Sequence, residues 1–262
     1  MNVVINSDCE AVPKYCRALK SHSSALLNML VCLGYDPLSL PLADVLKAHY
    51  KLQGDWAIVS PIHWEASHND AMIVALAQDT PDYKCFTVLK NHLAEEGIAL
   101  IQYSPEIWLM CIDNKPALAA KPVYQLMHHS MMPELAALDK SMYWQKFITE
   151  AQMLFASVSI SSPINGVWVW GNTPISAKKA LKICAEEPFY SLLNDIEVEV
   201  SLYHPATAVE DYELLLINDY ANLSASQKKQ LQKGPVNWYW NNTAYGNLTW
   251  LHILWRKLFH AH

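Results

Sequence analysis

No stretch of this 262-residue sequence approaches the roughly 18 consecutive apolar residues that cross a membrane. The N-terminal residues lack the basic region and the long apolar region of a signal peptide. Lysine and arginine form no large cluster, and the net charge is −6, so binding to the phosphates of nucleic acids is not expected. These absences predict a cytoplasmic protein that engages neither membranes nor nucleic acids.

The signatures of common enzyme families are missing too. The sequence has no G-x-G-x-x-G, no P-loop, no G-x-S-x-G, no H-E-x-x-H and no calcium-binding loop. Its six cysteines are scattered, without a C-x-x-C pair or a zinc-type spacing, which is typical of free thiols in a reducing compartment. No cofactor is evident, and the motifs do not identify a reaction.

The composition indicates a folded protein with a large core. Hydrophobic residues make up 52% of the chain and charged residues only 17%, which excludes a disordered protein. Ten tryptophans and thirteen tyrosines predict a core rich in aromatic rings. Helical and strand patterns alternate, so we expect an α/β fold with a mixed sheet flanked by helices. We interpret residues 1–262 as a single α/β unit, with a possible antiparallel α+β lobe at 50–135 and a possible α/β lobe at 140–262.

The apolar run at 166–170, Gly-Val-Trp-Val-Trp, predicts a strand that is covered on both faces. The segment 176–184 begins with a serine suited to an N-cap and continues with helix-forming residues, so a helix is expected there. Further amphipathic helices are predicted over 141–157 and 250–259.

Four polar residues beside predicted strands are candidates for ligand binding. Asn165 and Asn172 bracket the strand at 166–170, and Asn218 and Asp219 follow an apolar run at 214–217. Turns at the carboxyl ends of strands are where α/β proteins bind ligands, which favours Asn172, Asn218 and Asp219. For Asn165 the commoner alternative is a bridge to loop backbone.

Two histidines are weak candidates for metal ligands. His63 and His68 flank a predicted turn that also carries Glu65 and Asp70. A surface or core histidine is the commoner explanation for each. The paired carboxylates Glu95–Glu96 are interpreted as charges at a helix end rather than as a catalytic pair.

Five short blocks occur in an order typical of one family. They are Gly54–His63 (GDWAIVSPIH), His92–Gly97 (HLAEEG), Ser104–Leu109 (SPEIWL), Glu150–Leu154 (EAQML) and Pro163–Gly171 (PINGVWVWG). Together they resemble a family of bacterial phosphoglycerate-mutase-like proteins, also called Rpf-type regulatory proteins. That family is in turn distantly similar to archaeal-type cofactor-independent phosphoglycerate mutases of the alkaline-phosphatase-like superfamily, which use two divalent metals and a serine nucleophile.

The resemblance implies an alkaline-phosphatase-like derivative without the full set of mutase residues. Trp170 stands where the mutases have an arginine, and Thr149 stands where the regulatory family has an asparagine. Because phosphoryl transfer needs metals or basic side chains to neutralise charge, we expect a non-catalytic or regulatory protein that binds a small ligand or a protein partner. The alternative is a metal-dependent phosphomutase or phosphatase. A divalent metal is expected only under this alternative.

We predict that Trp168→Ala lowers the free energy of unfolding by about 3–5 kcal/mol, because it removes a large buried ring. Asn172→Ala should leave stability nearly unchanged. Urea denaturation of both variants measures the difference, and a neutral Trp168→Ala would contradict the expectation of a buried strand.

Overall fold

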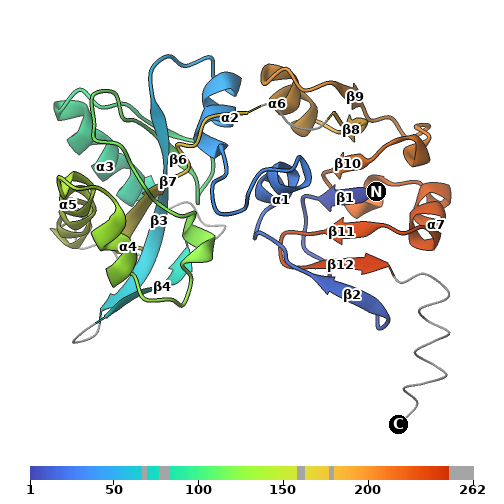
Figure 1. The fold of residues 1–262 in the computed structure, drawn as a ribbon, viewed down its shortest axis with the longest axis horizontal. Helices are drawn as coiled ribbons and strands as arrows, with labels where there is room; N and C mark the ends of the chain where they lie inside the picture. The colour runs from blue at the N-terminus through green and yellow to red at the C-terminus, as the bar shows by residue number, and fades with distance from the viewer. Residues whose placement is uncertain (67–69, 77–82, 158–162, 177–179, 248–262) are drawn as a thin grey trace, which may run out of the picture. The chain divides into compact units, whose positions relative to one another are not determined.

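The computed structural model describes residues 1–66, 70–76, 83–157, 163–176 and 180–247 (Figure 1). Contacts divide the chain into two compact units. The first combines the two ends of the chain, Met1–Asp36 and Ser176–His262, and the second is the intervening Pro37–Ile175. Each unit has its own sheet, and the mixed α/β architecture predicted from the sequence is confirmed. Among the residues described, no helix is long and apolar enough to cross a membrane.

A seven-stranded mixed sheet organises the first unit. In order across the sheet its strands are β2 (Cys16–Leu19), β12 (Ala244–Asn247), β11 (Asn237–Tyr239), β1 (Asn2–Ile5), β10 (Leu214–Ile217), β8 (Ile183–Ala185) and β9 (Val200–Leu202). The five strands from β11 to β9 are parallel, whereas β12 pairs antiparallel with β11 and β2. All four residues of β10 are fully buried, as expected for an interior parallel strand with both faces covered.

The first unit's helices pack on the sheet, and two of them begin at side-chain caps. The helices are α1 (Ala25–Cys32), α6 (Phe189–Asp195) and α7 (Ala225–Lys233), with short 3₁₀ turns η2 (Val209–Asp211) and η3 (Tyr220–Asn222). Ser24 caps α1, and Ser224 forms a capping box with Gln227 at the start of α7. Helix α1 packs against β1, and α6 packs against β8 and β9. Leu231 of α7 joins a core cluster with residues of β1, β10 and β11.

The second unit is built around one long antiparallel strand. Its strands are β3 (Trp56–Ala66), β4 (Ala71–Leu76), β5 (Leu100–Gln102), β6 (Trp108–Cys111) and β7 (Gly166–Trp170). Its helices are α2 (Leu42–His49), α3 (Tyr83–Glu95), α4 (Met132–Ala137) and α5 (Tyr143–Ser157), with a 3₁₀ turn η1 (Val123–Gln125). Ile58 of β3 pairs with Leu109 of β6 and with Trp170 of β7, so these two strands lie on opposite edges of β3. The carboxyl half of β3 pairs with β4.

Strand β7 is buried on both faces, as the sequence predicts. Each of its residues from Val167 to Trp170 is at most 1% exposed. The buried indole N–H groups have acceptors: Trp168 donates to the carbonyl of Lys121, and Trp170 to Oγ of Ser60, both at 2.9 Å. A buried indole needs such a partner because an unpaired donor is costly inside a protein.

The boundary between the two lobes expected from the sequence, near residue 140, falls inside the second unit. Helix α5 packs against β7, and β7 pairs with β3, so the segment 143–170 belongs with the antiparallel sheet. The α/β sheet instead includes β1, from the beginning of the chain, between β11 and β10. Long-range pairing of this kind leaves no local pattern in the sequence.

The helix predicted over 176–184 is wrong at its carboxyl end, where Ile183 and Cys184 lie in β8. These two buried apolar residues fit between β10 and β9, and this tertiary pairing overrides the helical preference of the preceding alanines and lysines. Residues 177–179 and the helix predicted over 250–259 lie outside the described residues. Helix α5 confirms the one predicted over 141–157.

Two glycines in the left-handed region offer a matched test of packing around β7. Gly171 has φ +78°, and a Cβ there would lie 2.8 Å from Cγ1 of Ile58, whereas Gly97 has φ +72° and open space around it. We predict that Gly97→Ala costs about 1–2 kcal/mol of stability, from backbone strain alone. Gly171→Ala should cost about 1–3 kcal/mol more, because the methyl group must displace Ile58. Equal urea midpoints for the two variants would show that the end of β7 is not crowded.

Candidate functional site

Helix α5 is held at its amino end by the carboxylate of Asp139. This carboxylate accepts hydrogen bonds from the backbone N–H groups of Ser141, Tyr143 and Trp144 and from the hydroxyl of Ser141, at 2.5–3.2 Å. Partial burial acts to raise the pKa of Asp139, but these hydrogen bonds outweigh it and hold the pKa below its usual value. The same contacts fix where α5 begins, and therefore which of its residues face α3.

Helix α3 presents an apolar stripe to the interior. Cys85, Leu89 and Leu93 recur every four residues and are buried, and Gly97 ends the segment in the left-handed conformation. Helix α3 packs against β5 and against α5. The residues that flank the stripe, His92 and Glu96, are consequently placed beside the helix–helix contact.

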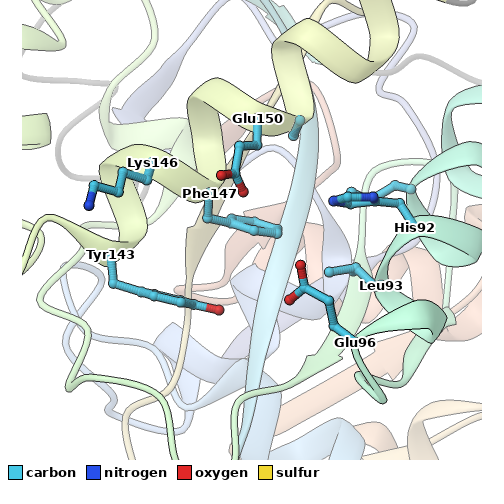
Figure 2. Close-up of a pocket in the computed structure, with 9 residues that line it drawn as sticks. His92, Leu93, Glu96, Tyr143, Lys146, Phe147 and Glu150 are labelled. Atoms are coloured by element: carbon cyan, nitrogen blue, oxygen red, sulfur yellow. The ribbon is translucent and has the colours of Figure 1, made fainter.

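A groove of about 220 Å³ lies between α3 and α5. Its lining comes only from these two helices and the residue that follows α3: Leu89, His92, Leu93, Glu96, Tyr143, Lys146, Phe147, Glu150 and Ala151. Four of these, Leu89, Leu93, Phe147 and Ala151, are buried and form an apolar floor. Figure 2 shows the carboxylates of Glu96 and Glu150 and the ring of His92 directed toward the space around Phe147, while Lys146 extends away from it.

The groove carries more negative than positive charge at its centre. Among the described residues, neither Glu96 nor Glu150 forms an ion pair. Lys115 lies near the groove but over the ring of Tyr143, with Nζ 5.2 Å from its centroid. The groove therefore combines an apolar floor with carboxylates that no neighbouring side chain neutralises, a composition typical of small-molecule sites.

The parallel sheet of the first unit has a second feature of α/β binding proteins. From β8 the chain continues to the neighbouring β9, and from β10 it crosses β1 to reach β11, so the chain leaves the adjacent strands β8 and β10 in opposite directions. A crevice forms at the carboxyl ends of strands at such a point. Asn218 and Asp219 follow β10 directly, so their predicted place at the end of a strand is confirmed.

The polar groups at this edge bind to one another. Glu186, after β8, accepts hydrogen bonds from the backbone N–H of Asn218 at 2.7 Å and from the amide of Asn222 at 3.0 Å. The amide of Asn218 donates to the carbonyl of Glu187. Asp219 caps η3 through the N–H of Ala221 at 2.7 Å. These contacts fasten the loop after β10 to the end of β8, and binding of a ligand by Asn218 or Asp219 stays a prediction.

Cys184 lies in β8 near this edge but is a poor nucleophile. Burial raises the pKa of its thiol to about 11, so the reactive thiolate is scarce at neutral pH.

Asn165 and Asn172 lie in the other unit, at the two ends of β7. The side chain of Asn165 accepts from the N–H of Trp64 at 2.9 Å and donates to its carbonyl at 2.8 Å. This is the bridge to backbone that the sequence left open as an alternative. Asn172 makes one long contact, from its amide to the carbonyl of Leu118 at 3.5 Å. The four candidates thus come from two different compact units.

Of the two candidate metal ligands, only His63 belongs to the described residues; His68 does not. Nδ1 of His63 hydrogen-bonds the carbonyl of Pro163, and Nε2 lies 3.9 Å from a carboxylate oxygen of Glu65. Within the described part of the chain, no three histidine, cysteine, aspartate or glutamate residues are grouped so that they could hold a metal ion.

The groove is not predicted from the sequence, although several of its residues lie in the blocks that carry the family resemblance. His92 and Glu96 lie in one of the blocks that carry the family resemblance, and Glu150 opens another. The Glu95–Glu96 pair was interpreted as a helix-end charge. Only the packing of α3 against α5 shows that Glu96 faces a groove, whereas Glu95 does not line it.

The chain matches no protein-family model and no curated protein. Among solved structures, it is distantly similar to a cofactor-independent phosphoglycerate mutase from Thermoplasma acidophilum DSM 1728. That alignment has a TM-score of 0.36 and 11% identity, and covers 89% of this chain and 78% of the mutase. These values describe a remote likeness and leave the function to be inferred from this chain's own residues.

We predict that Asn165→Ala lowers the free energy of unfolding by about 1–3 kcal/mol, because it leaves the backbone N–H of Trp64 without its acceptor. Asn172→Ala, which loses one long contact, is the matched control and should change stability by less than about 0.5 kcal/mol. Urea denaturation measures both. If the Asn165 variant unfolds at the same midpoint as the control, the bridge to Trp64 is not structural.

Proposed function

We propose that this protein is a non-catalytic, regulatory binding protein on a phosphoglycerate-mutase-like scaffold, and that the groove between α3 and α5 is its ligand site. One observation carries the proposal: two helices bring an apolar floor and a set of polar side chains together around one groove. Small-molecule sites in proteins have this composition, with a few polar groups to orient the ligand.

The role of the polar side chains supports the groove over the sheet edge. Glu186, Asn218 and Asp219 hold loops together in the first unit. Glu96 and Glu150, in contrast, have carboxylates directed into an open groove, with no ion pair among the described residues (Figure 2). A ligand can use these groups without breaking any contact that holds the fold.

The size of the groove limits the ligand that fits inside it to one smaller than a drug-sized molecule. At about 220 Å³ it lies below the roughly 300–1,000 Å³ typical of sites for drug-sized molecules. We further propose that the protein acts in the cytoplasm and that the Rpf-type blocks reflect its regulatory role. Two of those blocks, His92–Gly97 and the one beginning at Glu150, contribute residues to the groove.

A thermal-shift screen with phosphorylated metabolites, amines and divalent metals tests the proposal. A ligand that binds only the folded protein, at about 100 times its Kd, should raise the unfolding temperature by roughly 5–10 °C. We predict that Glu150→Trp, which places a bulky ring over the groove, abolishes this shift. Met153→Trp is the control, because Met153 is 68% exposed on the same helix and does not line the groove.

A ligand whose stabilisation survives Glu150→Trp binds elsewhere, and the proposed site is then wrong. Metal-dependent phosphatase or phosphomutase activity in the purified protein would contradict the non-catalytic role and favour the alternative function.

A further inference from the structure

Two carboxylates approach the groove from different helices. Glu96 follows the last residue of α3, and Glu150 lies within α5, with Phe147 one turn before it on the same helix. Figure 2 shows both carboxylates directed toward the space beside the ring of Phe147. A cation placed there would be attracted by the negative charge of both carboxylates.

The other polar groups of the groove can accept hydrogen bonds from a ligand that donates them. An imidazole nitrogen of His92 and the hydroxyl of Tyr143 can each accept a hydrogen bond. Both side chains are directed toward the groove in Figure 2. The one basic side chain of the lining, Lys146, extends away from this space, so it does not neutralise the carboxylates.

The apolar floor of the groove determines the chemistry of the rest of the ligand. Leu89, Leu93 and Ala151 offer only apolar surface, which excludes water from a hydrocarbon chain laid against it. A ligand that is charged throughout would leave this surface without a partner. The ligand therefore needs both an apolar part and a cationic end.

We infer that the groove between α3 and α5 binds a small organic amine, with its ammonium group between Glu96 and Glu150 and its short hydrocarbon chain on the floor. The inference rests on the proposed function and adds the class of ligand to it. A phosphorylated or carboxylated metabolite is disfavoured, because its anion would lie against two carboxylates. A neutral apolar molecule would remove water from those carboxylates without replacing it.

The experiment compares three probes of equal chain length by NMR titration of the full-length, isotope-labelled protein. Hexylammonium is positively charged at neutral pH, hexan-1-ol is neutral, and hexanoate is negatively charged. We expect hexylammonium to shift the amide signals of α3 and α5 and to bind about five- to tenfold more tightly than hexanol. The gain is modest because Glu96 and Glu150 are both exposed, and water screens their charges. Raising the salt concentration should weaken hexylammonium binding and leave hexanol unaffected.

Glutamine substitutions test whether Glu96 and Glu150 together bind the ammonium group. The double variant Glu96→Gln with Glu150→Gln keeps the shape of the groove and removes both charges, so its affinity for hexylammonium should fall to that for hexanol. Glu95→Gln is the control, since Glu95 is exposed on the same helix but does not line the groove. It should retain the affinity of the unaltered protein.

The outcomes distinguish a failure of the amine inference from a failure of the proposed ligand site. Equal or tighter binding of hexanoate, an unchanged affinity in the double variant, or no shift of α3 and α5 signals with hexylammonium would each overturn the amine inference. The binding function itself would still stand if another ligand's stabilisation is lost in Glu150→Trp and kept in Met153→Trp. If no ligand in the screen depends on Glu150, the proposed function fails together with the inference.

Discussion

The pairing of β7 with β3 is the contact on which the second unit depends. Five residue pairs join the strands, from Ile58 with Trp170 to Ile62 with Gly166, across more than one hundred residues of sequence. Because α5 precedes β7 in the chain and packs against it, the position of β7 determines where α5 lies on the sheet. Helix α3, which packs on β5 and on α5, then forms the groove with it.

The buried tryptophans make this pairing specific as well as stable. Trp170 donates to Ser60, a residue of β3, and Trp168 donates to the backbone carbonyl of Lys121. A strand shifted by one residue would turn each indole to the opposite face and leave its N–H group unpaired. The rings therefore fix the register of β7, in addition to contributing apolar surface to the core.

The two units use their polar residues differently. At the carboxyl edge of the parallel sheet, a glutamate and two asparagines connect the loops after β8 and β10, so these polar groups bind one another. At the groove of the second unit, glutamates from two helices face open space above an apolar floor. A strand edge at a topological switch point is a general place for ligands, but it binds one only where its polar groups are available.

The sequence alone determined the fold class, helix α5 and the burial of β7, since each of these follows from local periodicity. Tertiary structure alone decided that β7 joins β3, that residues 183–185 form a strand, and that the parallel sheet draws β1 from the far end of the chain. Pairing between distant segments depends on the complementarity of their surfaces, which no short window of sequence contains. For the same reason Glu96 and Glu150, fifty-four residues apart in the chain, become one candidate site only when α3 packs against α5.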